Sequence, residues 1–155
     1  MKIKSFAWIP TALLLTIYQT NAFAKDNSLL EFGVGVEYGG IGTQFHFPIG
    51  GKTFDIYGAV GLFSYSTQTE GQVGAGVGMN FYLDSNNSIN LYSGVMNSNS
   101  YYTDNLERKT DVDLGLSVGY KYHFHKIKKS GWVLGVSYNV YKDDHYPFIS
   151  IGYRY

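Results

Sequence analysis

The sequence predicts an all-β fold, an eight-stranded antiparallel transmembrane up-and-down β-barrel. Three observations predict it: eight segments alternate between apolar residues and glycine or polar residues, turn residues separate these segments, and the first 24 residues resemble an export signal. Alternation with a period of two places every second side chain on one face of a strand. Each predicted strand therefore has one apolar face and one face of glycine, amides and a few charges.

Residues 1–24 are expected to be a signal peptide that is cleaved after export. Lys2 and Lys4 form a basic start, an apolar run follows, and Ala22-Phe23-Ala24 provides a small-x-small cleavage site. The alternative is a membrane-anchoring helix, but Pro10 interrupts the apolar run, which ends short of the roughly 20 residues that span a bilayer. Residues 25–155 then form a single outer-membrane β-barrel domain.

Composition excludes several classes of function. The chain has no cysteine, so it has no disulfide framework and no thiolate metal site. Loss of Lys2 and Lys4 leaves 12 − 2 = 10 basic against 12 acidic side chains, which gives no electrostatic footprint for nucleic acid. No apolar run after residue 24 is long enough for a spanning helix, so the mature part is either a soluble β-sandwich or a membrane barrel.

The eight strands follow from the alternation in chain order. Clear two-faced patterns occupy residues 30–38, 72–83, 111–124, 132–140 and 148–155. Weaker patterns occupy residues 41–49, 53–64 and 88–96. Turn signals rich in Gly, Asn, Asp and Ser separate them, at 39–40, 50–51, 67–71, 84–88, 97–110, 126–131 and 142–147.

The second face of the strands favours a membrane barrel over a sandwich. In a soluble sandwich that face is solvated and carries many Lys, Glu and Thr residues. Here it is mostly glycine, which suits the crowded interior of a narrow barrel. An even number of strands puts both chain ends in the periplasm and pairs the first strand with the last. Outward aromatic residues then gather near that end, at Phe45, Phe47, Phe54, Phe81, Tyr122, Phe124, Trp132, Tyr153 and Tyr155.

Together these features resemble the small outer-membrane barrels of the OmpA/OmpX type. The ending Gly152-Tyr153-Arg154-Tyr155 is similar to the carboxy-terminal signal read by the barrel assembly machinery, although such signals usually end in Phe or Trp. The resemblance implies export through the Sec pathway to the bacterial outer membrane, contact with outer-membrane lipids including lipopolysaccharide, and a monomer. It is architectural and includes no family-specific motif, so no activity transfers with it.

Ionisable side chains on the inward faces form a predicted lumen charge network. Its members are Glu31, Glu37, Asp55, Asp111, Asp113, Lys121 and Arg154, with His46 and His123 beside them. Charges enclosed in a narrow barrel must be paired or reached by water. Glu31 and Arg154 lie on the two closing strands and are expected to be neighbours. The network is interpreted as a structural plug, with a narrow ion path as the alternative.

Catalytic and metal sites have weaker support. Outer-membrane barrels can be enzymes that act on lipid or protein through a Ser or Asp with a His, and the candidates here are His145 beside Asp143 and Asp144, with Ser64 or Ser66 one loop away. A loop histidine near acids is more often a solvated surface group, and the chain has no His-x-Ser motif. His123 and His125 share a strand face without a third ligand, so neither a metal nor a cofactor is expected.

The segment 97–110 is expected to be the longest extracellular loop. Tyr101 and Tyr102 within it, together with His145, are candidate contacts for a surface partner, because exposed tyrosines suit recognition. The function predicted from the sequence is therefore a non-enzymatic outer-membrane barrel with a structural or surface-interaction role. Two alternatives stay open: a lipid A-modifying enzyme and a narrow pore.

Overall fold

A computed structural model describes residues 30–155 except 50, 52, 67–69, 103–107 and 143, with side chains described outside 64–70 and 99–108. The predicted signal peptide lies outside the described residues. The elements are β1 (Leu30–Gly35), the 3-10 turn η2 (Val36–Tyr38), β2 (Gly40–Phe47), β3 (Phe54–Ser66), β4 (Glu70–Tyr82), β5 (Asn87–Tyr102), β6 (Arg108–His123), β7 (Gly131–Tyr141) and β8 (Asp144–Arg154). Among the described residues, no helix is long and apolar enough to cross a bilayer.

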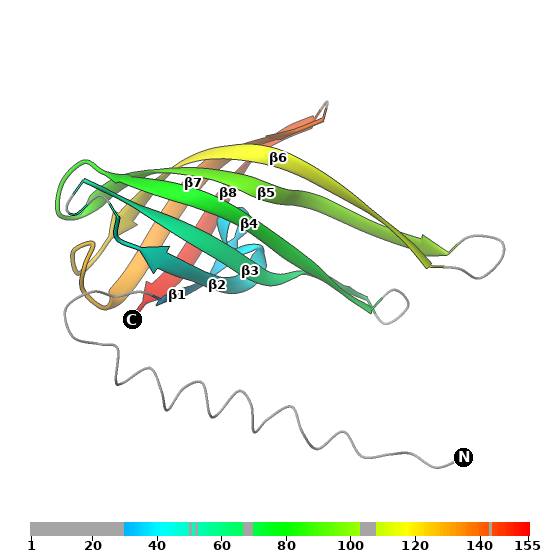
Figure 1. Ribbon diagram of the computed structural model, residues 1–155, viewed down its shortest axis with the longest axis horizontal. Coiled ribbons are helices and arrows are strands. Elements are labelled where there is room, and N and C mark those ends of the chain that lie inside the picture. The colour runs from blue at the N-terminus through cyan, green and yellow to red at the C-terminus, as the bar shows by residue number, and fades with distance from the viewer. Residues whose placement is uncertain (1–29, 50, 52, 67–69, 103–107, 143) are drawn as a thin grey trace, which may run out of the picture.

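The eight strands form a closed antiparallel barrel in sequence order, which confirms the all-β fold class (Figure 1). β1 pairs with β8 from Glu31 opposite Arg154 to Val34 opposite Ile151, so the predicted closing pair is confirmed. The carboxy-terminal end of β8 lies beside the start of β1, at one end of the barrel (Figure 1).

The strands are staggered as they go around the wall. Paired residues lead from Glu31 through Gln44, Ala59, Gly76, Gly94, Gly115, Tyr141 and Asp144. Val34 of β1 pairs with Ile151 of β8, so Asp144 would fall opposite position 41 if β1 continued straight. One circuit of the wall, which started at Glu31, therefore advances by 10 residues along β1. Such a stagger accompanies strand tilt. A residue and its paired partner on the next strand therefore lie at slightly different heights along the barrel axis. The residue at the same height is a little over one position away from that partner.

The wall has an apolar outside and a polar inside. β7 shows this at every position from Gly131 to Val140, because buried and exposed residues alternate strictly. Its exposed side chains are apolar or aromatic, including Trp132 and Leu134, whereas Ser137 and Asn139 on the other face are buried. The two faces thus follow the period of two that the sequence predicts.

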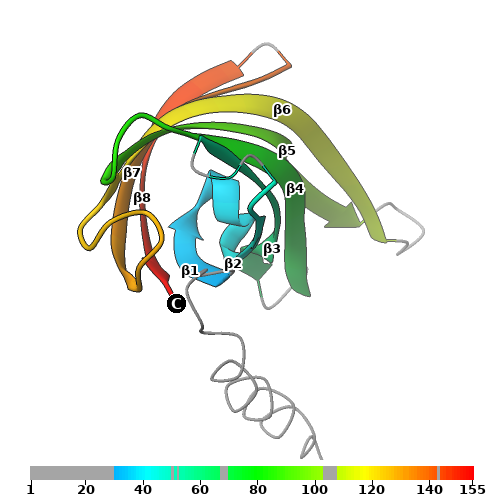
Figure 2. The same cartoon turned by 60° about the vertical axis from the view of Figure 1, so that its left-hand side comes forward.

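The first strand is shorter than predicted. It ends at Gly35, and the turn η2 folds into the lumen, where Figure 2 shows it enclosed by the wall. The alternation over residues 30–38 puts Val36 and Tyr38 on the apolar face and so predicts that they point outward. This is wrong, because they are only 4% and 1% exposed, inside the barrel. Gly39 and Gly40 have φ angles of 73° and 101°, a left-handed conformation that glycine adopts readily and that turns the chain back into β2.

Two pairs of strands continue past the closed wall as ribbons. The register shifts between Leu62 and Ser64 in β3 and between Val95 and Asn97 in β5. The β4–β5 pairing stops at Gly76 opposite Gly94, while β3–β4 and β5–β6 continue. Figure 1 shows both ribbons projecting at the end of the barrel opposite the carboxy terminus.

The longer ribbon corrects the predicted loop at 97–110. β5 continues to Tyr102 and β6 begins at Arg108, so Tyr101 and Tyr102 are strand residues opposite Lys109 and Arg108. His145 is likewise a strand residue, opposite Val140. Sequence reasoning missed the β5 side of this ribbon because residues 97–102, Asn-Ser-Asn-Ser-Tyr-Tyr, do not alternate between apolar and polar and read as a turn.

Candidate functional site

Glu31 stands at the centre of a buried ion-pair cluster in the lumen. Its Oε2 accepts a hydrogen bond from Arg154 Nε at 2.8 Å, and Arg154 Nη2 lies 2.8 Å from the same oxygen. Lys121 Nζ of β6 lies 3.3 Å from Oε1, which also accepts a hydrogen bond from the Tyr38 hydroxyl. All four side chains are buried. One carboxylate from β1 thus holds cations from β6 and β8 across the barrel.

A second branch leads from this cluster to Asp55 on β3. His46 Nδ1 lies 2.9 Å from Asp55 Oδ2, and Arg154 Nη2 lies 3.3 Å from His46 Nε2. Asp55 Oδ1 accepts a hydrogen bond of 2.8 Å from Asn80 Nδ2, and Tyr82 also donates to this carboxylate. Both carboxylate oxygens of Asp55 therefore accept hydrogen bonds, as a buried carboxylate requires.

Asparagine and tyrosine side chains fill the lumen above the charges. Asn90 Nδ2 donates to Tyr57 Oη at 2.7 Å and to Asn80 Oδ1 at 2.8 Å. The Tyr57 ring stacks on Tyr92, with ring centroids 6.5 Å apart and planes inclined by 10°. Lys121 Nζ lies 5.4 Å from the centroid of the Tyr57 ring, a cation–π distance. The interior at this level is packed rather than open.

The inward glycines make room for these tyrosines. A Cβ atom at Gly33 or Gly152 would lie closer than 3.0 Å to the Tyr38 side chain. A Cβ atom at Gly78 would meet Tyr57 in the same way. Cβ atoms are essentially never found so close to another heavy atom. The glycine face that the sequence shows is therefore the surface against which aromatic rings pack.

The structure divides the predicted network into separate groups. Glu31, Asp55, Lys121 and Arg154 belong to one connected cluster through His46. Glu37 lies apart, where its Oε1 accepts a hydrogen bond of 2.5 Å from Ser150 Oγ. His123 is buried, with Nε2 3.1 Å from Ser88 Oγ.

Two further predicted members lie in the β5–β6 ribbon. Asp113 accepts a hydrogen bond of 3.1 Å from Asn97 Nδ2 and pairs with Lys142. Asp111 is exposed, so its placement in an enclosed lumen is wrong. The alternation of β6 continues from the barrel into the ribbon, whereas the enclosing wall ends at the barrel. Alternation in the sequence therefore cannot show whether a residue on the inward face lies in the closed lumen or in the ribbon.

Sequence reasoning missed the uncharged members of the cluster. Gln44, Asn80 and Asn90 all fall on the inward side of the predicted alternation, which is the signal that finds them. Gln44 Oε1 accepts a hydrogen bond of 3.0 Å from Lys121 Nζ, and its Nε2 donates to the Glu37 carbonyl at 2.9 Å. Tyr38 gives no such signal, because its position depends on the inward turn.

The catalytic candidates are not assembled into a site by the described contacts. His145 is exposed on β8, and its ring centroid lies 5.7 Å from that of Tyr138. Asp144 accepts hydrogen bonds from the His145 backbone at 2.7 Å and from Tyr141 at 3.2 Å. Asp143 and the side chains of Ser64 and Ser66 lie outside the described residues. Within the described part of the chain, no three His, Asp or Glu residues are grouped to hold a metal.

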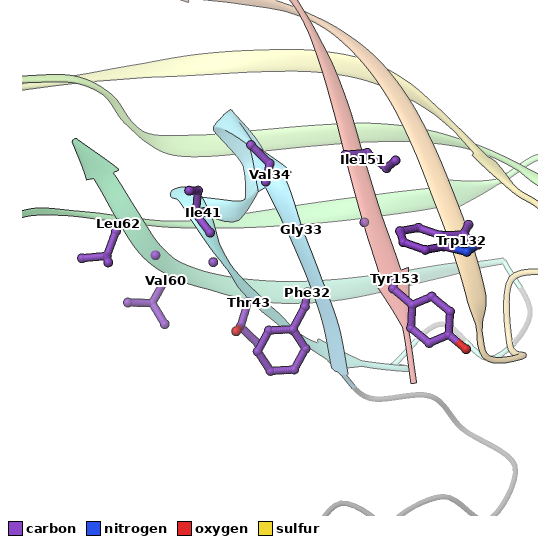
Figure 3. Close-up of a pocket in the computed structure, with 13 residues that line it drawn as sticks. Phe32, Gly33, Val34, Ile41, Thr43, Val60, Leu62, Trp132, Ile151 and Tyr153 are labelled. Carbon is purple, nitrogen blue, oxygen red and sulfur yellow. The ribbon is translucent and has the colours of Figure 1, made fainter. Parts of the chain in front are cut away.

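The outer wall carries an apolar groove over β1 and its neighbours. This hollow has a volume of about 540 Å³. Figure 3 shows its lining from Leu62 on β3, past Phe32 on β1, to Tyr153 on β8. A second hollow of about 350 Å³ adjoins it and shares Val34, Ile41 and Leu62. Both are lined mainly by apolar side chains and glycine, so nothing in them marks a polar substrate.

Aromatic pairs surround the end of the barrel where the carboxy terminus lies. Edge-to-face contacts join Phe32 to Tyr155, with centroids 5.8 Å apart, and Trp132 to Tyr153, at 5.4 Å. Further pairs are Phe54 with Phe81 and Tyr122 with Phe124. These rings form a belt on the outside of the wall.

The fold and lumen define a class: a closed eight-stranded antiparallel barrel with an apolar exterior and a charge-paired interior. No protein-family model matches the chain, and neither the curated proteins nor the solved structures include a match. Its function must therefore be argued from its own geometry.

Proposed function

We propose that this protein is an integral barrel of the bacterial outer membrane with a closed lumen and a structural or surface-interaction role. The observation that carries the proposal is that the wall is apolar on its outside and polar on its inside. Large apolar side chains such as Ile41, Leu114 and Ile149 are about two-thirds exposed or more, whereas Glu31 and Arg154 are buried inside. A barrel that is apolar outside and polar inside suits hydrocarbon rather than water.

The belt of aromatic side chains supports an orientation in that membrane. Aromatic residues favour the level of lipid headgroups, because their rings are amphipathic. With this belt at the periplasmic interface, the start of β1 and the end of β8 face the periplasm and the two ribbons project from the cell surface. Lipids, including lipopolysaccharide, are then the immediate neighbours of the wall, and the carboxy-terminal strand is the segment offered to the assembly machinery.

The ribbons support the surface-interaction part of the proposal. The described β4–β5 ladder ends at Gly76 opposite Gly94, while β5 continues its ladder with β6, so this part of β5 is an edge strand. Such an edge can accept a strand from a partner, with main-chain hydrogen bonds providing affinity. The segment is rich in Asn, Ser and Tyr, residues that suit adaptable recognition.

Cell fractionation tests the location. We expect the protein in the outer-membrane fraction, released only by detergent, and migrating on a gel at a different position before and after boiling. A tightly closed barrel that resists detergent denaturation gives this heat-dependent shift, because the strands of its closed wall pair with one another around the whole circuit. A soluble periplasmic protein made by the same cells is the control. Recovery of this chain with that control would contradict the proposal.

Planar-bilayer recording tests the closed lumen. We expect no stepwise conductance from the wild-type barrel, because Glu31, Lys121 and Arg154 are joined across the interior and tyrosine rings pack above them. A porin reconstituted in the same way provides the positive control. Reproducible single-channel steps from the wild type would replace the closed barrel with a narrow pore.

A further inference from the structure

A gap opens in the wall beside the inward turn η2. β8 pairs with β7 along its whole length, whereas its described ladder with β1 covers only residues 151–154. On the other side of the gap, β3 pairs with β4 as far as Ser66 but with β2 only as far as Leu62. Longer β1 and β2 strands would fill the space between, but the turn that joins them folds into the lumen instead (Figure 2). β8 and β3 therefore border an opening above this turn.

The inward face of β8 is uncovered in the gap. Phe148 lies on the same face of the strand as Ser150 and Arg154, which are each 2% exposed, yet Phe148 is 36% exposed. The register of β8 against β7 is continuous, so no bulge turns Phe148 outward. Pro147 beside it has no backbone N–H, and proline within a sheet belongs on an edge strand. The same proline makes this edge a poor template for an added strand.

The second hollow, of about 350 Å³, lies in this gap. It shares Val34, Ile41 and Leu62 with the groove on the outer wall, and Figure 3 shows these three side chains. Its lining also includes Val36 and Tyr146. Val36 belongs to the turn η2 and is buried inside the barrel. The hollow therefore leads from the outer surface of the wall to the lumen.

The floor of the second hollow is apolar, unlike the charged cluster deeper in the lumen. Val36 packs with Tyr92 and Met96, and Tyr146 packs against this group. Tyr146 Oη donates a hydrogen bond of 3.3 Å to the Met96 carbonyl on β5, so its side chain reaches across the lumen. None of the described residues that line the hollow carries a charge. The hollow therefore suits a hydrocarbon chain and offers no ion pair to a charged headgroup.

The height of the second hollow follows from its position on β8. Phe148 and Tyr146 are five and seven residues from Tyr153, a member of the aromatic belt. A rise of about 3.3 Å per residue and a strand tilt of about 40° put them about 13 and 18 Å from the belt. The apolar band of an outer-membrane barrel is about 25 Å tall, so the hollow lies in the half of the band farther from the belt. In the orientation proposed above, that half is the outer leaflet.

We propose that the second hollow binds the end of one acyl chain of an outer-leaflet lipid, which passes Ile41 and Leu62 and ends against Val36 and Tyr146. The inference rests on the proposed membrane location and adds a defined binding site to the general contact between wall and lipid. The hollow is near the lower end of the roughly 300–1,000 Å³ that small-molecule sites occupy, so it has room for one slender chain. Because it opens onto the apolar wall, the chain enters without leaving the hydrocarbon.

Photo-cross-linking in vesicles tests the site. The purified protein is reconstituted into phosphatidylcholine vesicles that contain a small fraction of phosphatidylcholine with a diazirine at the end of one acyl chain. After illumination, mass spectrometry of the digested protein identifies the labelled residues. We expect label on Val36 and Tyr146, inside the wall, as well as on Ile149 and Leu114, whose side chains are exposed on the outer wall.

Variants then assign the inner label to the second hollow. Ile41→Trp puts an indole ring at the opening and should lower the labelling of Tyr146 severalfold, while Ile149 is labelled as before. Leu114→Trp is the matched control, because Leu114 is 69% exposed against 67% for Ile41 but does not line the hollow. It should leave the labelling of Tyr146 unchanged. If Ile41→Trp does not fold, Leu62→Trp on the β3 side of the opening replaces it.

The outcomes separate this site from the membrane location itself. Label on the two outer-wall residues but none on Val36 or Tyr146 would overturn the site and leave the membrane location standing. No label on either side of the wall would contradict the membrane location, and the site with it. Protection of Ile41 and Leu62 together with Tyr146 would mean that a second copy covers the hollow, which also overturns the proposal. So does an unchanged label on Tyr146 in Ile41→Trp.

Discussion

Glu31→Gln is expected to lower the free energy of unfolding by about 3–5 kcal/mol, the usual cost of removing one partner from a buried ion pair. The carboxylate is bonded to Arg154 Nε at 2.8 Å and lies 3.3 Å from Lys121 Nζ, and all three groups are buried. The variant leaves two buried cations facing a neutral amide. Urea unfolding in detergent micelles, followed through the fluorescence of Trp132, measures the loss.

Two variants make this prediction specific. Asp111→Asn removes an exposed carboxylate and should change the unfolding free energy by less than about 0.5 kcal/mol. Adding Lys121→Met to Glu31→Gln removes one of the two buried cations that have lost the Glu31 charge, so the double variant should be more stable than Glu31→Gln alone. A Glu31→Gln barrel as stable as the Asp111→Asn barrel would show that the cluster does not stabilise the fold.

The cluster was largely predictable because it depends on two simple rules. Alternation decides which residues face inward, and closure brings the first strand to the last, so Glu31 and Arg154 meet. Lys121 is 90 positions from Glu31 in the chain, yet it pairs with the same carboxylate, because an inward cation in a narrow barrel must pair with one of the inward acids. Sequence could not show which cation each acid would take, since that depends on the stagger of the strands.

The inward turn could not be predicted from local sequence. Residues Val34, Val36 and Tyr38 continue the apolar alternation of β1, and only the first of them faces outward. The direction of the turn is decided by distant glycines that allow its backbone to approach the wall, including Gly61 on β3 and Gly74 on β4. A contact of this kind appears in the sequence only as two more glycines on an inward face.

The second large prediction concerns those glycines. Gly61→Val is expected to lower the free energy of unfolding of the barrel by at least about 3 kcal/mol, the upper end of the usual range for overpacking. A Cβ at Gly61 would lie 2.6 Å from the Ile41 carbonyl oxygen and 2.7 Å from that of Tyr38. Both atoms belong to the backbone, so no side-chain rotation can relieve the clash. We expect the fraction that shows heat-dependent gel migration to fall sharply.

Gly58 provides a matched control on the same strand. It lies three positions before Gly61, and a Cβ there would meet no heavy atom within 4 Å. Gly58→Val should fold as well as the wild type, because a β-branched residue suits a strand better than glycine does. Gly74→Val should behave like Gly61→Val, since its Cβ would lie 2.5 Å from the Gly39 carbonyl oxygen on the same turn. If all three variants fold equally well, the turn does not pack against this wall, and the position of Glu37 and Tyr38 inside the lumen would be wrong as well.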